Sequence, residues 1–457
     1  MGPARGAESK LILRNEQPAM NKMAFVTLSV IAIAASAWAQ TPPARPDEKT
    51  LSDAYAYLLG RTLVIRQEDM DRHGDGFAYN AIKYNLLGSA DFVNPNFDVA
   101  YLETWFAVDD RTPVLLEVPV IKGRYYTAQV LDEWGEVIVN INERTFPSKP
   151  YGKFALVKPG FAGTIPIDAA RIELHSSKAK MLGRVEIKDD PGGAARLQQQ
   201  FKVTALGTPL IAPPPAITMF DNADLIGADI FDDVDAKLTS ALDVAPNAAE
   251  MQQKVRAVAA YVASGKDARA AVDAQLRGII SQFKEDALTK TAPYRNHWLC
   301  GNVGGYYETD YRRRTTANYA GIWANSPSEV VYFIGTRDAN EQLLSGSNSY
   351  IMHFQADRLP ESVVDAYWSV ILVDVPDFRV VPNSLKRYNF NNHSPLQKET
   401  DGSLKIAVAP KPVAGVPELN WLPSAEGKPF SLTFRAYVPR EAAQKCEWTP
   451  PALEKVN

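Results

Sequence analysis

The sequence predicts a mainly β fold with two antiparallel β-sandwich or jelly-roll-like modules joined by a helical connector. Short runs of β-branched and aromatic residues, separated by turn residues, occupy two regions, roughly 92–184 and 294–438. Between them, residues 222–288 carry apolar side chains at helical spacing. Strands that follow one another without intervening helices indicate antiparallel sheets rather than a parallel sheet.

Length and composition describe a folded protein of several domains. The 457 residues suffice for two or three domains of ~100–200 residues each. A hydrophobic content of 46% with 22% charged residues is typical of globular proteins and not of disordered chains. The net charge of −4 argues against a nucleic-acid partner, which would require a basic face.

The N-terminal segment has the pattern of a secretory signal peptide. Lys22 precedes the apolar run 23–33, and Ala37 and Ala39 form a small-residue cleavage site. The apolar run is shorter than the ~20 residues that span a bilayer as a helix. We therefore expect cleavage after Ala39, a periplasmic or secreted protein, and no stable transmembrane anchor after cleavage. Residues 1–39 would be an upstream extension and signal peptide; an uncleaved membrane anchor is the alternative.

The first β module is expected over residues 40–215. Residues 51–68 have helical spacing, with Ser52 and Asp53 as candidate capping residues. The strands expected after this helix are 101–108, 114–119, 125–131, 137–141, 154–157 and 171–174.

A proline-rich stretch, 212–215, marks the boundary to the helical connector, which is expected over residues 216–290. Apolar side chains recur at helical spacing in 248–264 and again in 268–283. These two segments are predicted to be amphipathic helices that pack against the β modules.

The second β module is expected over residues 291–457. Its clearest strands are 330–334, 350–354, 367–373, 404–408 and 430–437. The turns between them carry the Gly, Asn, Asp and Ser residues that turns favour. No repeat of fixed period joins the two β regions, although they could share a plan.

The two cysteines, Cys300 and Cys446, flank the strands of the second β region. An exported protein meets an oxidising compartment, where a disulfide between them would close a long loop. We expect this disulfide; two separate buried thiols are the alternative.

A polar and aromatic stretch, 302–314, is the candidate ligand-binding segment. It contains three tyrosines, acidic residues and three consecutive arginines, which suit a pocket for a polar ligand. The same residues could instead form internal ion pairs between domains. The predicted ligand-binding residues, here and in the strands that follow, are Tyr306, Asp310, Tyr311, Arg312, His353, Trp368 and Arg387.

Signatures of established catalytic chemistry are missing. The sequence has no Gly-x-Ser-x-Gly elbow, no His-Glu-x-x-His zinc motif and no phosphate-binding glycine loop, and we predict no metal site. Asp310 and His353 are the candidate catalytic residues, as general bases. Asp98 and Asp132 in the first module are further carboxylates for acid–base work, although each could simply stabilise a turn.

Several motifs resemble those of bacterial exported proteins that pair domain of unknown function 1254 with domain of unknown function 1214. The first resemblance runs over roughly 53–188 and is carried by NPNFDVAY (94–101), GRYYTAQVLD (123–132) and YGKF (151–154). The second runs over roughly 291–439 and is carried by DYRRR (310–314), GSNSY (346–350), HF (353–354), WS (368–369), VPNS (381–384), RY (387–388) and NWLP (420–423). The resemblance implies tandem β-sandwich or jelly-roll modules with helices between them, and no agreed biochemical activity.

The leading functional hypothesis is an exported cell-envelope protein that binds a small or glycan-like ligand near the second β module. A hydrolase that uses Asp310 or His353 at the same pocket is one alternative. A structural homo-oligomer without a small ligand is another. The sequence identifies no cofactor and leaves open whether the protein is an enzyme.

Overall fold

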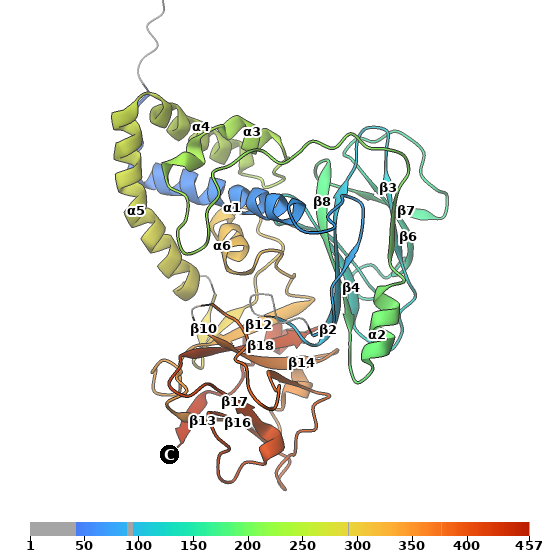
Figure 1. Ribbon diagram of the computed structural model, residues 1–457, viewed down its shortest axis with the longest axis vertical. Coiled ribbons are helices and arrows are strands. Elements are labelled where there is room, and N and C mark those ends of the chain that lie inside the picture. The colour runs from blue at the N-terminus through green and yellow to red at the C-terminus, as the bar shows by residue number, and fades with distance from the viewer. Residues whose placement is uncertain (1–42, 89–94, 291, 376, 457) are drawn as a thin grey trace, which may run out of the picture. The chain divides into compact units, whose positions relative to one another are not determined.

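The computed structural model describes residues 43–88, 95–290, 292–375 and 377–456 (Figure 1). The expected signal peptide and its cleavage site after Ala39 lie outside the described residues. Within them, the strands form four sheets, two in each β region, and the mainly β fold class predicted from the sequence is confirmed.

The first module is a sandwich of a five-stranded and a four-stranded sheet, with strand orders β1-β2-β8-β4-β5 and β7-β6-β3-β9. Its apolar core lies between the two sheets and includes Leu102, Leu116, Phe154 and Met181. The strands are β1 (Lys83–Tyr84), β2 (Val99–Ala107), β3 (Val114–Val118), β4 (Tyr126–Leu131), β5 (Val137–Ile141), β6 (Gly152–Val157), β7 (Ala169–Glu173), β8 (Lys178–Glu186) and β9 (Lys202–Ala205).

The second module is a sandwich of a six-stranded and a four-stranded sheet, with strand orders β10-β11-β12-β18-β14-β15 and β17-β16-β13-β19. Its core includes Trp298, Trp368, Phe434 and Trp448. The strands are β10 (Tyr294–Arg295), β11 (Trp298–Gly301), β12 (Val330–Gly335), β13 (Ser349–Phe354), β14 (Trp368–Asp374), β15 (Asn389–Asn391), β16 (Leu404–Ala409), β17 (Trp421–Pro423), β18 (Phe430–Tyr437) and β19 (Leu453–Val456).

The two modules share one strand topology. Each strand of the first module, from β1 to β9, has its counterpart ten strand numbers later, in the same place in the corresponding sheet. Even the parallel pairs match, because β6 pairs in parallel with β7 and β16 with β17. The shared plan therefore exists in three dimensions although no repeat of fixed period is evident in the sequence.

The helices form a third apolar core, which α1 (Glu48–Arg72) shares with the connector helices. The other helical elements are α2 (Pro191–Gln198), η1 (Ala228–Phe231), α3 (Val234–Thr239), α4 (Ala248–Ala263), α5 (Lys266–Thr289), α6 (Tyr311–Gly321), η2 (Pro360–Val363), η3 (Glu418–Asn420) and α7 (Glu441–Gln444). In the described part of the chain, no helix combines the length and the apolar composition needed to span a membrane.

Helix α1 packs against α4 and α6 (Figure 1). At the crossing with α6, a Cβ on Gly60 would lie 2.5 Å from Thr315 Oγ1, so only glycine allows this approach. The helix begins after Asp47, whose side chain accepts a hydrogen bond from the Thr50 amide. The prediction that Ser52 and Asp53 cap the helix was wrong, because both lie inside it.

Most expected strands are confirmed, but the long strand β8 was not predicted. β8 is a nine-residue strand in which Ala179, Met181 and Val185 face the core while the alternate side chains include Lys178, Lys180, Arg184 and Glu186. Such a strand looks solvent-exposed in the sequence, yet these charged residues are buried. The expectation that residues 302–314 lead directly into strands was also wrong, since α6 begins at Tyr311.

The expected disulfide between Cys300 and Cys446 is present, and both residues are buried in the core of the second module. It joins β11 to the segment after α7 across a sequence separation of 146 residues.

Removing this disulfide should destabilise the protein. Closing so long a loop restricts the unfolded chain, and we expect Cys300→Ser with Cys446→Ser to lower the free energy of unfolding by on the order of 3–5 kcal/mol. Urea unfolding of the oxidised protein and the double variant measures the difference. Equal midpoints with equal slopes would contradict this account.

Candidate functional site

Asp310, a predicted catalytic residue, is the N-cap of α6. Its Oδ1 accepts a hydrogen bond from the Arg313 amide at 3.0 Å, and its side chain is half-exposed. A carboxylate in this position satisfies a free amide at the helix start and favours the positive end of the helix dipole. This contact gives Asp310 a structural role at the start of α6.

Tyr311 and Arg312 attach α6 to α1. Arg312 Nη2 donates to Asp53 Oδ1 at 2.6 Å, and the Tyr311 ring lies edge-on to Tyr57 with centroids 6.0 Å apart. Burial alone would raise the pKa of Asp53, but hydrogen bonds from Lys49 and Arg312 hold it down at about 2. Arg312 is therefore engaged in a helix–helix ion pair.

The other predicted ligand-binding residues lie elsewhere. Trp368 is fully buried in the core of the second module, where it stacks on Phe434 at 5.6 Å. His353 lies on the opposite side of β13 from the core residues of that strand. Arg387 Nη1 donates to the backbone oxygens of Glu418 and Trp421, and Tyr306 is exposed. Among the described residues, no hydrogen bond or ion pair joins Asp310, Arg312, His353 and Arg387 to one another.

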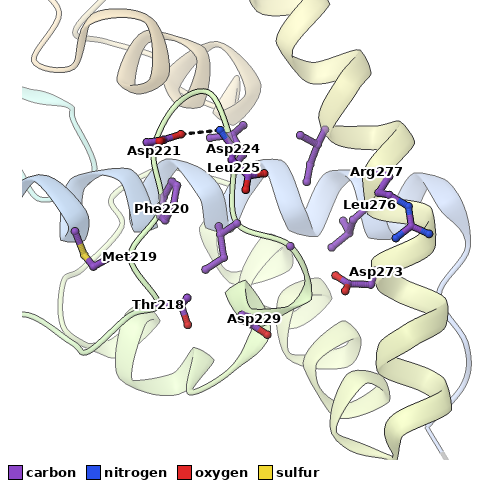
Figure 2. Close-up of a pocket in the computed structure, with 13 residues that line it drawn as sticks. Thr218, Met219, Phe220, Asp221, Asp224, Leu225, Asp229, Asp273, Leu276 and Arg277 are labelled. Atoms are coloured by element: carbon purple, nitrogen blue, oxygen red, sulfur yellow. Dashed lines mark hydrogen bonds between the residues drawn. The ribbon is translucent and has the colours of Figure 1, made fainter.

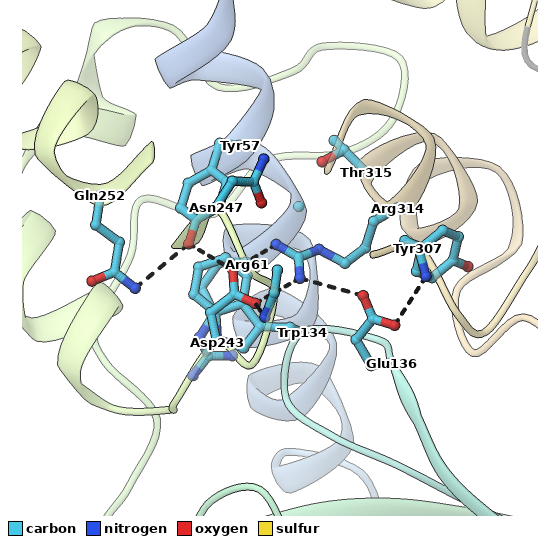
Figure 3. A network of polar contacts seen from close by, with 12 residues as sticks. Tyr57, Arg61, Trp134, Glu136, Asp243, Asn247, Gln252, Tyr307, Arg314 and Thr315 are labelled. Carbon is cyan, nitrogen blue, oxygen red and sulfur yellow. Dashed lines mark hydrogen bonds and ion pairs between the residues drawn. The ribbon is translucent and has the colours of Figure 1, made fainter. Parts of the chain in front are cut away.

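Arg314 is the centre of a buried polar network (Figure 3). Its two amino groups donate to the two carboxylate oxygens of Asp243, each at 2.8 Å. Asp243 Oδ2 also accepts from the Tyr57 hydroxyl at 2.6 Å, and Glu136 Oε2 accepts from the Tyr307 amide at 3.2 Å. The network joins α1, the β4–β5 turn, the connector and α6.

Arg314 belongs to the DYRRR motif (310–314), but it was not among the site residues predicted from the sequence. Three consecutive arginines on a helix point in directions about 100° apart, so a helix that packs along one face buries at most one or two of them. The side chain of Arg314 is 2% exposed, whereas that of Arg313 is 40% exposed. A helix prediction for residues 311–321 would have indicated that one of these arginines is buried.

Further charges are buried beside this network. Arg61 Nη2 lies 3.4 Å from Glu133 Oε1, and Lys178 Nζ lies 2.6 Å from Glu68 Oε1. At the edge of the same region, His175 Nδ1 lies 2.7 Å from the Oδ2 atom of Asp132.

Burial in this region alters acid–base behaviour. It raises the pKa of Glu133 and of Glu136 from 4.5 to about 7, against the opposing attraction of Arg61 and Arg314 respectively. Burial alone would lower the pKa of His175, but the carboxylate of Asp132 raises it. Perturbed groups of this kind occur both at functional sites and in structural ion-pair networks.

A cavity of 760 Å³ lies between residues 218–229 and α5 (Figure 2). Its apolar lining includes Leu225 and Leu276, and its polar lining is mostly aspartate. Asp273 accepts a hydrogen bond from the Ala228 amide at 2.8 Å, and Asp221 accepts from the Asp224 amide at 2.7 Å. These carboxylates therefore already hold the surrounding backbone in place. A second cavity, of 640 Å³, lies on the first module beside Lys149, Lys153 and Lys202.

The two modules meet through the outer faces of their larger sheets, and this contact is polar and rich in tyrosine. On the first module, Arg184 of β8 has Tyr101 and Thr127 as its cross-strand neighbours. The second module has the same arrangement of an arginine between a tyrosine and a hydroxyl residue: Arg435 of β18 has Tyr332 and Ser369 as its cross-strand neighbours.

Side-chain hydrogen bonds cross this contact. The Tyr125 hydroxyl donates to Glu329 Oε2 at 3.0 Å, and Asn389 and Asn391 donate to Asp98 Oδ1 at 2.8 and 2.7 Å. We call the region around Tyr101, Arg184, Tyr332 and Arg435 the module interface. Within the described ranges, no group of three or more His, Cys, Asp and Glu side chains is arranged to hold a metal ion.

Comparisons with known proteins agree with the two-module organisation. The family model described as protein of unknown function DUF1254 matches residues 79–205, and the one described as protein of unknown function DUF1214 matches residues 329–441. The comparison with curated proteins finds no match.

Two solved structures are similar to this chain. The crystal structure of a protein from Vibrio parahaemolyticus matches over 90% of this chain and 100% of its own, with a TM-score of 0.63 and 19% identity. That likeness concerns the fold alone. The crystal structure of an uncharacterized protein from Burkholderia cenocepacia matches over 90% of this chain and 95% of its own, with a TM-score of 0.43 and 11% identity.

Breaking the central ion pair should be costly. We expect Arg314→Met to lower the free energy of unfolding by about 3–5 kcal/mol, because Asp243 would remain buried without its cation. Arg313→Met, at the neighbouring exposed position, should change it by less than about 1 kcal/mol. Urea titrations of both variants test this, and similar losses would show that burial of Arg314 is not the cause.

Stability should fall as the pH rises from about 5 to 8. The folded-state pKa of Glu133 and of Glu136 is raised, so their contribution is complete below about pH 4.5 and is lost as the pH passes about 7. His175, whose pKa is also raised, acts in the same direction. Urea unfolding at four pH values should show a loss on the order of 1–3 kcal/mol. Glu136→Gln should flatten the profile, and a rise in stability over this range would contradict the assignment.

Proposed function

Because this chain belongs to the proteins that pair a DUF1254 domain with a DUF1214 domain, we propose that it is an exported cell-envelope protein that binds a small molecule at its module interface. The observation that carries the binding proposal is the composition of that interface. Two facing sheets place tyrosine, arginine and hydroxyl side chains opposite each other where an apolar seam would suffice for cohesion.

Export is supported by two independent features. The alanine-rich segment before Gln40 has the order of a cleavable signal peptide. The disulfide between Cys300 and Cys446 suits an oxidising compartment, since cytosolic thiols are kept reduced.

Binding at the module interface is supported by its position and its side chains. Ligand sites occur preferentially between domains and combine apolar walls with a few polar groups. Tyr101 and Tyr332 are half-buried, so solvent reaches part of each, whereas Tyr125, Tyr367 and Tyr437 of the same cluster are buried. The rings provide flat faces for a ring-bearing ligand such as a glycan or an aromatic compound.

A hydrolase is the second candidate, with the Asp132–His175 pair in place of Asp310 and His353. Asp132 Oδ1 accepts from the Trp134 and Glu136 amides, and its Oδ2 orients the imidazole of His175. The His175 side chain is 26% exposed. An oriented, accessible imidazole is suited to general base catalysis, although no nucleophile lies beside it among the described contacts.

Native mass spectrometry of the protein purified from the periplasm of an expressing bacterium tests the proposal. The expected mass begins at Gln40, has both cysteines oxidised and carries a non-covalent ligand that dissociates on activation. Tyr332→Ala should lose the ligand or weaken its affinity at least about tenfold, since one stacked ring is worth about 1.4 kcal/mol.

Tyr306→Ala is the matched control, because Tyr306 is 52% exposed and is not one of the tyrosines that define the module interface. A protein that stays uncleaved in the cytoplasm would refute export. A purified mature protein that retains no ligand, and takes up none from a panel of sugars and aromatic compounds, would refute binding. Turnover of such compounds that is lost in His175→Gln and kept in Tyr332→Ala would favour the hydrolase instead.

A further inference from the structure

Arg184 is a buried cation without a carboxylate partner. The residue is 3% exposed, and among the described residues it forms no ion pair. Its Nη1 donates to the amide oxygen of Gln129 at 2.7 Å, while its Nε is buried and has no hydrogen-bond partner. Part of the hydrogen-bonding capacity of the guanidinium is therefore unused.

Four other buried cations of the described chain are paired with carboxylates. Arg61 lies against Glu133, and Arg314 against Asp243. Lys178 lies 2.6 Å from Glu68, and Lys180 lies 2.7 Å from Glu103. Most buried cations in the described part of the chain thus have a carboxylate partner, and buried Lys237 donates to the backbone oxygens of Ile230 and Asp232 instead. Among the described residues Arg184 has neither, in the region where the two modules meet.

Among the described residues, the side chains that hydrogen-bond to Arg184 or lie beneath its guanidinium are an amide and a tyrosine ring. Its guanidinium lies over the Tyr101 ring, 5.4 Å from the centroid. Tyr125, Tyr332 and Tyr437 are close enough to interact with it electrostatically. The hydroxyl of Tyr332 accepts a hydrogen bond from Asn325 at 2.6 Å, which leaves its proton available for another acceptor. The Tyr332 hydroxyl and the Arg184 guanidinium are thus two donors in one region.

The second module contributes a further cation to this place. Arg435 is 4% exposed, and both it and Arg184 interact electrostatically with Tyr332 and Tyr437. Two buried guanidiniums from different modules therefore act on the same pair of tyrosines. Arg435 also interacts electrostatically with the Asp98 carboxylate, so we base the inference on Arg184.

A buried arginine keeps its charge, because its pKa is too high for burial to neutralise it. Burying such a charge without a counter-ion costs free energy that the fold must offset elsewhere. Proteins keep costs of this kind at functional sites, where a ligand supplies the missing partner.

We propose that Arg184 binds the carboxylate or phosphate group of a small organic anion at the module interface, with Tyr101 and Tyr332 flanking the body of the ligand. This inference rests on the proposed function and narrows it from any small molecule to an anionic one. A planar guanidinium can bind two oxygens of such a group at once, which a tyrosine site alone could not do. The anion enters beside Tyr101 and Tyr332, the members of the cluster that solvent reaches.

The test compares anions with matched neutral molecules on the mature, oxidised chain 40–457. The probes are benzoate against benzamide, glucuronate against glucose, and inorganic phosphate alone, all at one ionic strength set with chloride. We expect at least one anion to raise the melting temperature of the wild type in a concentration-dependent way, and its neutral analogue to have no effect. Benzoate or glucuronate without phosphate would assign a carboxylate ligand, and phosphate alone a phosphorylated one.

Arg184→Met is the decisive variant. Because it removes a charge without a counter-ion, its melting temperature should equal or exceed that of the wild type, and it should lose the response to anions. Arg184→Lys keeps the charge without the planar fork, so it should fold and bind the anion at least tenfold more weakly. Arg171→Met, which removes one positive charge from β7 in the other sheet, should respond to anions as the wild type does.

Three results would overturn the inference. Anions could leave the wild type unchanged, they could stabilise Arg184→Met as much as the wild type, or Arg184→Met could melt far below the wild type as expected for Arg314→Met. Neutral analogues that bind equally well to the wild type and to Arg184→Met would refute the anion site and leave the broader binding function standing. Failure of every probe and of ligand retention would remove both.

Discussion

The arrangement of this protein depends on burying the polar outer face of β8. Its charged side chains need partners, because an isolated buried charge is destabilising by several kcal/mol. At one end, Lys178 and Lys180 find carboxylates on α1, which covers that part of the sheet. At the other end, His393 of the second module lies 3.1 Å from Glu186. A single strand therefore requires both a helix and a second module as its cover, and Arg184 lies between these two ends.

The same alternation explains what could be predicted from the sequence. Strands such as β14 and β18 carry runs of apolar and aromatic residues and were identified, as were the amphipathic helices α4 and α5. β8 was missed because its buried charges resemble a solvent-facing side, and their partners lie up to 207 residues away in the sequence. The disulfide was predictable because the chain has only two cysteines.

The candidate site was harder to predict because the role of a side chain depends on the helix, strand or loop that carries it. Asp310 suggested catalysis when residues 302–314 were taken as a loop before strands, and became a helix cap once α6 began at Tyr311. Trp368 lies in a strand, as predicted, but its side chain faces the core of the second module. Conversely, Arg184 looked like the end of a β region, and its lack of a carboxylate is visible only when both modules are assembled.

The disulfide also has a topological consequence for the second module. Cys300 lies in β11 and Cys446 follows α7, so the covalent link encloses β12 to β18 in a closed ring of chain. A protease that cuts one loop inside this ring leaves two pieces that stay joined, held by the bridge as well as by the strands of both sheets. Because of this ring, a single cut does not detach part of the module, and the nicked module stays covalently connected.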